Sequence, residues 1–261
     1  MLGFDAFPKP KLFQQDQRPM VAIIIDDLGH RWDNSLRSLR LPGEVTLAIL
    51  PFSPYAQKLA EQAHTAQKEV ILHAPMEPIS HHSWDGGIDR DMDERSVRDS
   101  LAQMLAGLPN ARGVNNHMGS AVTPELELMN WVMEELAGRD LYFVDSRTSV
   151  NSRAIEAAQA QSVPNIKRDV FLDNNREPSA IAAQLRKLIA IAKKRGSAVG
   201  IGHPYPETLQ VLEELLPNLA EEGIRLAPVS QLIERQIPNI AKYDRPSQIE
   251  INIPPQNAKS I

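Results

Sequence analysis

A repeated alternation of short apolar runs with amphipathic stretches constrains this 261-residue chain more than any other feature. Each β-branched or apolar run predicts a buried strand, and apolar residues three to four positions apart predict a helix. The predicted strands are residues 21–25, 45–50, 70–72, 112–114, 141–144, 198–201 and 225–228, with a weaker candidate around 165–172. The predicted helices are residues 32–39, 55–66, 94–108, 124–137, 152–160, 179–195 and 206–222.

This alternation predicts an α/β fold in which parallel strands are joined by crossover helices. Seven or eight such units in residues 19–235 fit a closed (β/α) barrel better than an open doubly wound sheet. No glycine-rich dinucleotide pattern or Walker pattern follows a strand, so a nucleotide site has no support. Both ends lack the alternation and contain several prolines. We therefore expect an extended arm at 1–18 and an extended tail at 236–261.

The composition excludes several classes of protein. The chain has 28 basic and 33 acidic residues and no basic block, which argues against a nucleic-acid partner. Its longest apolar run, residues 20–25, is far shorter than the roughly 20 residues of a membrane span, so we expect no integral membrane protein. The absence of cysteine excludes disulfides, cysteine-bound zinc, iron–sulfur clusters and thiol nucleophiles. The seven histidines become the natural place to look for a metal or a general base.

Several predicted strands end in titratable residues. The carboxyl ends of the strands carry the working residues of (β/α) barrels, so these side chains are expected to meet at one face. They are Asp26, Asp27, His73, His117, Asp145 and His203. Aspartate and histidine are the ligands that zinc, or a comparable divalent cation, binds where sulfur is absent. The remaining histidines have no such position: His30, His64, His81 and His82.

Each of these residues also has a simpler explanation when taken alone. An aspartate after the first strand could cap the next helix, His73 could be a hydrogen-bonded core residue, and His203 could merely end its strand. Four strand ends that each carry a ligand-type residue by chance would be a rare coincidence, which favours a metal site. Side chains of neighbouring strand residues point to opposite faces. Asp26 and Asp27 can therefore share a site only where the strand turns, which Gly29 permits.

Five motifs stand in order along the chain: IIIDDLG at 23–29, LHAPMEP at 72–78, GVNNHMGS at 113–120, DSRT at 145–148 and IGHP at 201–204. This series resembles the divergent polysaccharide deacetylases, a bacterial branch of the NodB-homology carbohydrate esterases. The resemblance covers residues 19–235. It implies a distorted (β/α) barrel of seven or eight strands of the NodB-homology deacetylase type. It also implies one divalent metal ion, usually zinc, and the removal of N-acetyl or O-acetyl groups from a cell-envelope glycan.

The resemblance also implies roles for individual residues. The expected metal ligands are Asp27, His73 and His117, and the expected catalytic residues are Asp26, His203, Asp145 and Arg147. In the implied reaction Asp26 takes a proton from a water that the metal activates, and His203 donates a proton to the leaving amine. Asp145 and Arg147 match the segment that positions the catalytic aspartate.

The chain departs from the parent deacetylases in two motifs. The parents carry both metal histidines in one His-x-x-x-His motif, whereas His73 and His117 are 44 positions apart, and the parental Arg-x-Pro-Tyr motif is missing. Three alternatives therefore stay open. The first is a non-catalytic metal-binding envelope protein that binds a glycan or a protein partner. The others are a metal-dependent hydrolase of a phosphoester or glycosidic bond, and a barrel without metal.

The expected partner is an acetylated polysaccharide or a peptidoglycan fragment. Trp84, in the irregular segment 77–93, could offer a stacking surface for a sugar ring. The resemblance implies a periplasmic or otherwise exported protein, although the first residues show no signal-peptide pattern. Nothing in the sequence indicates the oligomeric state.

Overall fold

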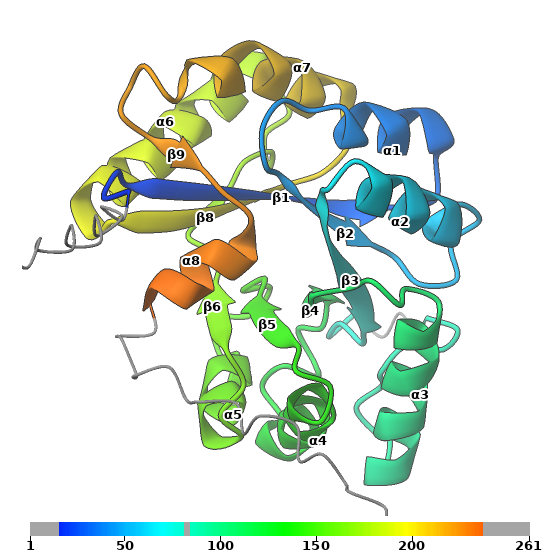
Figure 1. Cartoon of the computed structure of the whole chain (residues 1–261). Helices are drawn as coiled ribbons and strands as arrows, with labels where there is room; N and C mark the ends of the chain where they lie inside the picture. The colour runs from blue at the N-terminus through cyan, green and yellow to red at the C-terminus, as the bar shows by residue number, and fades with distance from the viewer. Residues whose placement is uncertain (1–15, 81–83, 237–261) are drawn as a thin grey trace, which may run out of the picture.

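The strands of the computed structural model, which describes residues 16–80 and 84–236, form one parallel sheet that curls into a barrel (Figure 1). In chain order they are β1 (Met20–Leu28), β2 (Thr46–Ile49), β3 (Glu69–Met76), β4 (Gly113–Met118), β5 (Tyr142–Asp145), β6 (Asn165–Lys167), β7 (Val170–Phe171), β8 (Ser197–Gly202) and β9 (Arg225–Leu226). The sheet order is β6-β5-β4-β3-β2-β1-β8-β7, and β9 pairs with β1. Within the described residues no pairing joins β6 to β7, so the barrel is open along that seam. The predicted distorted (β/α) barrel is confirmed.

Seven helices were predicted, and all seven are present. The helices are α1 (Trp32–Leu39), α2 (Ala56–Thr65), α3 (Glu94–Ala106), α4 (Leu126–Ala137), α5 (Ala154–Ala160), α6 (Pro178–Arg195), α7 (Pro206–Leu215) and α8 (Val229–Gln236). The predicted helix at 206–222 is wrong at its end. A 3₁₀ turn (Leu216–Asn218) follows α7, because Pro217 lacks the N–H that would continue the helical ladder. Helix α8 was not predicted.

Alternate residues of each strand face either the surrounding helices or the barrel interior. In β1, Val21, Ile23 and Ile25 belong to the larger apolar cluster beneath the helices, whereas Ala22 and Ile24 belong to a second cluster inside the barrel. Helix α8 adds its buried apolar residues to that second cluster and so closes the amino-terminal end of the barrel. The carboxyl end of the interior is left to polar residues.

None of the helices within the described residues is both long and apolar enough to cross a bilayer. The predicted arm at 1–18 and tail at 236–261 lie almost wholly outside the described residues, and both stay predictions. Gly196 ends α6 in the left-handed conformation, at φ 91°, which glycine adopts without strain.

Candidate metal and catalytic site

Asp26 and Asp27 lie in a bulge near the end of β1. The pairing of β1 with β2 shifts register between Ile25 and Leu28, and Asp27 adopts a left-handed conformation with φ 57°. A bulge of this kind turns two consecutive side chains toward the same side of a strand. The turn that the sequence predicts is thus made at Asp27 itself, two residues before Gly29, whose φ is 111°.

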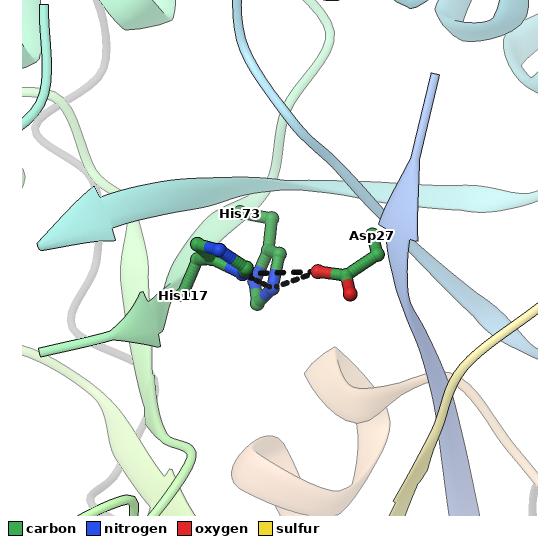
Figure 2. Close-up of side chains that lie close together, drawn as sticks. All are labelled: Asp27, His73 and His117. Carbon is green, nitrogen blue, oxygen red and sulfur yellow. Dashed lines mark hydrogen bonds and ion pairs between the residues drawn. The ribbon is translucent and has the colours of Figure 1, made fainter. Parts of the chain in front are cut away.

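Three donor atoms from three strands meet at the carboxyl end of the barrel (Figure 2). Oδ1 of Asp27 lies 2.9 Å from Nδ1 of His117 and 3.2 Å from Nε2 of His73. These two ring nitrogens are 3.0 Å apart. The structure therefore brings together the three residues that the sequence predicts as metal ligands.

The bonding of these atoms fits a bound cation. Oδ1 of Asp27 is buried, and no group in the described residues donates a well-aligned hydrogen bond to it, despite the two nearby ring nitrogens. A buried carboxylate oxygen without such a bond is costly, and a cation shared by the three donors would satisfy it. One carboxylate and two imidazoles form a three-ligand set of the kind that leaves zinc an open position.

Asn115 connects the metal ligands to Asp26. Its Oδ1 lies 2.8 Å from Nδ1 of His73, and its Nδ2 donates to Oδ1 of Asp26 at 2.9 Å. Because an amide oxygen only accepts, Nδ1 of His73 carries a proton, and Nε2, which faces Asp27 and His117, is the nitrogen that can bind a metal. The sequence analysis missed this role. The alternation of side chains along β4 could have indicated this role, because Asn115 and His117 are two positions apart and therefore face the barrel interior together.

The two aspartates have pKa values shifted in opposite directions. Burial raises the pKa of Asp26, and His73 and His203 only partly oppose it. Burial also acts to raise the pKa of Asp27, but the adjacent imidazoles of His117 and His73 outweigh it and lower that pKa. Burial lowers the pKa of His117. Burial also acts to lower the pKa of His73, but the carboxylates of Asp26 and Asp27 outweigh it and raise that pKa to about 8.

His203 is held beside this cluster by Asp173, a buried carboxylate. Nδ1 of His203 lies 3.0 Å from Oδ1 of Asp173, and its backbone N–H donates to Oδ2 at 2.6 Å. The imidazole packs against the rings of Phe171 and Tyr205, with centroids 5.3 and 5.4 Å away. Its Nε2 lies 3.8 Å from Oδ2 of Asp27. The pKa of His203 is raised. Burial acts to lower it, but the hydrogen bond and the charge of Asp173 outweigh that effect.

Asp173 was also missed by the sequence analysis. The weak strand candidate at 165–172 ends directly before it, and the structure resolves this candidate into β6 and β7. Had that candidate been counted with the stronger strands, Asp173 would have joined the titratable residues at the strand ends.

The structure does not bring Asp145 or Arg147 into the cluster. Asp145 alternates with Phe143, which packs beneath the helices, and its carboxylate accepts from the Ser152 hydroxyl and the Arg147 backbone N–H. Ser146 faces the site instead and accepts a hydrogen bond from Asn115 at 3.2 Å. Among the described residues no hydrogen bond or ion pair joins the side chain of Asp145 or Arg147 to Asp26, so their positioning role stays a prediction.

Arg168 is a half-buried cation near this segment. Its guanidinium donates to the carbonyl oxygens of Ser146 and Arg147 at 2.7 and 3.1 Å. Burial lowers its pKa, and the charges of Asp145 and Asp26 oppose that effect. The positive charge of Arg168, which lies between β6 and β7, thus acts on Asp26, and none of the five sequence motifs contains this residue.

The two sides of the cluster differ in access. The ring of Trp84 meets that of His117 edge-on, with centroids 4.8 Å apart, so Trp84 packs against a predicted metal ligand.

A cavity of about 480 Å³ adjoins the cluster at Asp27 and His203, which form part of its lining, and it opens between α1 and α7. These helices lie next to each other (Figure 1) and are joined by the ion pair of Arg37 and Glu213. His81 and His82 lie outside the described residues.

Comparison with known proteins gives matches along most of the chain. A family model described as divergent polysaccharide deacetylase matches residues 23–233. YibQ, an uncharacterized protein of Escherichia coli K12, is 36% identical over 239 residues, which are 91% of this chain and 71% of that protein.

Two solved structures show the same fold. The crystal structure of ATU2773, an uncharacterized protein from Agrobacterium tumefaciens C58, has a TM-score of 0.80 at 27% identity, over 82% of this chain and 89% of that one. The other is a mutant of BA3943 from Bacillus anthracis, described as a CE4 family pseudoenzyme with restored enzymatic activity. Its TM-score is 0.52 at 16% identity, over 84% of this chain and 69% of that one, which is a likeness of fold alone.

Proposed function

The chain belongs to the divergent polysaccharide deacetylase family, and on that premise we propose that it is a hydrolase that removes N-acetyl or O-acetyl groups from a cell-envelope glycan. The observation that carries this proposal is the position of Asp26 and His203 beside the three donors. A buried carboxylate and an imidazole there have different environments, which suits one to accept a proton and the other to donate one.

Asp27, His73 and His117 would hold one divalent cation, and zinc suits two nitrogen donors and one oxygen donor best. When bound, such an ion supplies Lewis acidity, which lowers the pKa of water and polarises an acetyl carbonyl. Asn115 keeps His73 in the tautomer that can bind it, because Nδ1 donates to the amide oxygen.

Asp26 would accept the proton of the attacking water. Its Oδ1 is held by the amide of Asn115, while its Oδ2 lies 3.7 Å from Nε2 of His73 and faces the three donors. Burial raises the pKa of Asp26, which makes the carboxylate a stronger base than one in water.

His203 would donate a proton to the leaving amine or alcohol. Asp173 accepts the hydrogen bond of Nδ1 and raises the pKa of the imidazole, so that the proton on Nε2 is retained closer to neutral pH. Nε2 is also the nitrogen that faces Asp27, and the adjoining cavity gives a substrate access to it.

The test combines metal analysis with acetate release from N-acetylated oligosaccharides and peptidoglycan fragments. We expect about one equivalent of metal per chain and turnover that Asp26→Asn abolishes while the metal is retained. Bound metal without acetate release from any acetylated glycan would instead favour a non-catalytic glycan-binding or protein-binding role. The description of BA3943 as a pseudoenzyme gives that alternative a precedent in this fold. Two equivalents of metal with phosphoester cleavage would favour a different hydrolase.

The same proposal includes an exported location, periplasmic or in the cell envelope. It is supported by the resemblance to exported deacetylases and by the class of substrate. Fractionation of cells that carry the native gene, followed by immunodetection of the protein, tests it. Detection in the cytoplasmic fraction alone would contradict it.

A further inference from the structure

The cavity beside the proposed active site has a basic wall. Its volume of about 480 Å³ lies within the range of small-molecule sites and accommodates a sugar ring with substituents. Asp27 and His203 form part of the lining, so a molecule bound there directly adjoins the proposed metal ligand and proton donor. Arg31 and Arg176 line the same cavity, and Asp27 is the one acidic residue among the described residues of the lining.

Arg31 is an exposed residue of the cavity lining. It precedes the first residue of α1, and its guanidinium has no hydrogen bond or ion pair to any other residue in the described part of the chain. A guanidinium carries five N–H donors in a planar fork that matches the oxygens of a carboxylate or a phosphate. An arginine without a protein partner on a cavity wall is therefore available to a bound anion.

Arg176 is a second guanidinium, and it is held in place. It lies 4.2 Å from the centre of the Tyr205 ring, and its Nη2 bonds Glu207 at 2.9 Å. Tyr205 in turn packs against His203. The ion pair with Glu207 uses only Nη2, so Nε and Nη1 of Arg176 remain able to donate.

We propose that this cavity binds an anionic group of the substrate, a carboxylate or a phosphate, between Arg31 and Arg176 while the acetyl group lies at Asp27 and His203. Neutral sugars are bound through hydroxyls that both donate and accept, whereas this wall is rich in donors and its one carboxylate is a proposed metal ligand. The inference rests on the proposed function and narrows the substrate to acidic acetylated glycans.

Binding rather than turnover tests this. The full-length protein is titrated by calorimetry with three probes: N,N′-diacetylchitobiose as the neutral probe, the disaccharide of N-acetylglucosamine and N-acetylmuramic acid as the carboxylate probe, and N-acetylglucosamine 1-phosphate as the phosphate probe. We expect at least one acidic probe to bind roughly tenfold or more tightly than the neutral one, since hydrogen bonds to charged groups contribute that much. Comparison of the two acidic probes identifies which anion the cavity prefers.

Arg31→Gln should remove most of this preference and leave the affinity for the neutral probe unchanged, and Arg31→Lys should retain part of it. Arg40→Gln is the matched control, because Arg40 is an exposed arginine at the other end of α1. Arg176→Gln tests the second guanidinium independently. Equal affinity for neutral and acidic probes, or an equal loss for all probes in Arg31→Gln, would overturn the inference. Tight binding of an acidic probe without acetate release supports it and contradicts only the proposed hydrolase activity.

Discussion

Asp26 and Asp27 are consecutive residues of β1, yet both carboxylates lie within 3.7 Å of one atom, Nε2 of His73. The bulge at the end of β1 and the left-handed conformation of Asp27 make this possible. Burial raises the pKa of Asp26, whereas the neighbouring imidazoles of His117 and His73 lower the pKa of Asp27 against the effect of burial. Two neighbouring residues of the same type are thereby suited to different roles, one as a proton acceptor and one as a metal ligand.

Asp27→Ala should reduce bound metal from about one equivalent to below roughly a tenth, because it removes the only carboxylate among the three donors. Elemental analysis of the purified proteins measures this. Asp91→Ala is the control, since that side chain is 96% exposed. Full metal content in the Asp27 variant would rule out the site.

Asn115→Ala should weaken metal affinity roughly 10-fold to 100-fold, because His73 loses the partner that sets its tautomer. Asn116→Ala is the matched control: Asn116 donates to the Met118 carbonyl and accepts from the Ser146 N–H, and its side chain bonds none of the three metal ligands. It should cost about 1–3 kcal/mol of unfolding free energy and leave metal affinity unchanged. Chelator competition and urea denaturation separate the two, and equal metal affinities would contradict the role of Asn115.

Metal affinity should fall as the pH is lowered. The pKa of His73 is raised to about 8, so below that pH a proton competes with the metal for Nε2. Burial lowers the pKa of His117, which therefore adds no competition in this range. We expect a loss of roughly tenfold per pH unit below about 8 and little change above it. Competition with an indicator of known proton affinity measures this, and a constant affinity down to about pH 6.5 would contradict it.

Asp173→Asn should lower turnover roughly a hundredfold or more while metal content stays unchanged, because the amide no longer stabilises protonated His203. Thr208→Val is the control. It removes the other side-chain hydrogen bond to Asp173, the 2.8 Å contact from Oγ1, without touching His203. Similar turnover in the two variants, measured by acetate release, would show that Asp173 does not act through His203.

Leu232→Ala should lower the free energy of unfolding by about 2–5 kcal/mol, since Leu232 is fully buried where α8 closes the barrel. Metal content should not change, because α8 lies at the end of the barrel opposite the three donors. Urea denaturation measures the stability. A change below about 1 kcal/mol would mean that the α8 contact contributes little to the folded barrel.

The sequence by itself determined the barrel and the edge at which its polar residues gather. Apolar runs that alternate with amphipathic stretches can bury their apolar side chains in a parallel sheet that is covered by helices. In such a sheet the carboxyl ends of the strands share one face. This reasoning brought Asp26, Asp27, His73, His117 and His203 to one place, because each lies just beyond the carboxyl end of a predicted strand.

Only the tertiary structure decided which way the side chains at that edge point. Asp27 joins Asp26 through a bulge that depends on the register between β1 and β2, a pairing of distant segments that local sequence does not specify. Asp145 follows an apolar run as His73 does, but it alternates with Phe143 and therefore faces the helices. Asn115 and Asp173 acquire their roles from hydrogen bonds across 42 and 30 positions of chain, which exist only once the barrel has formed.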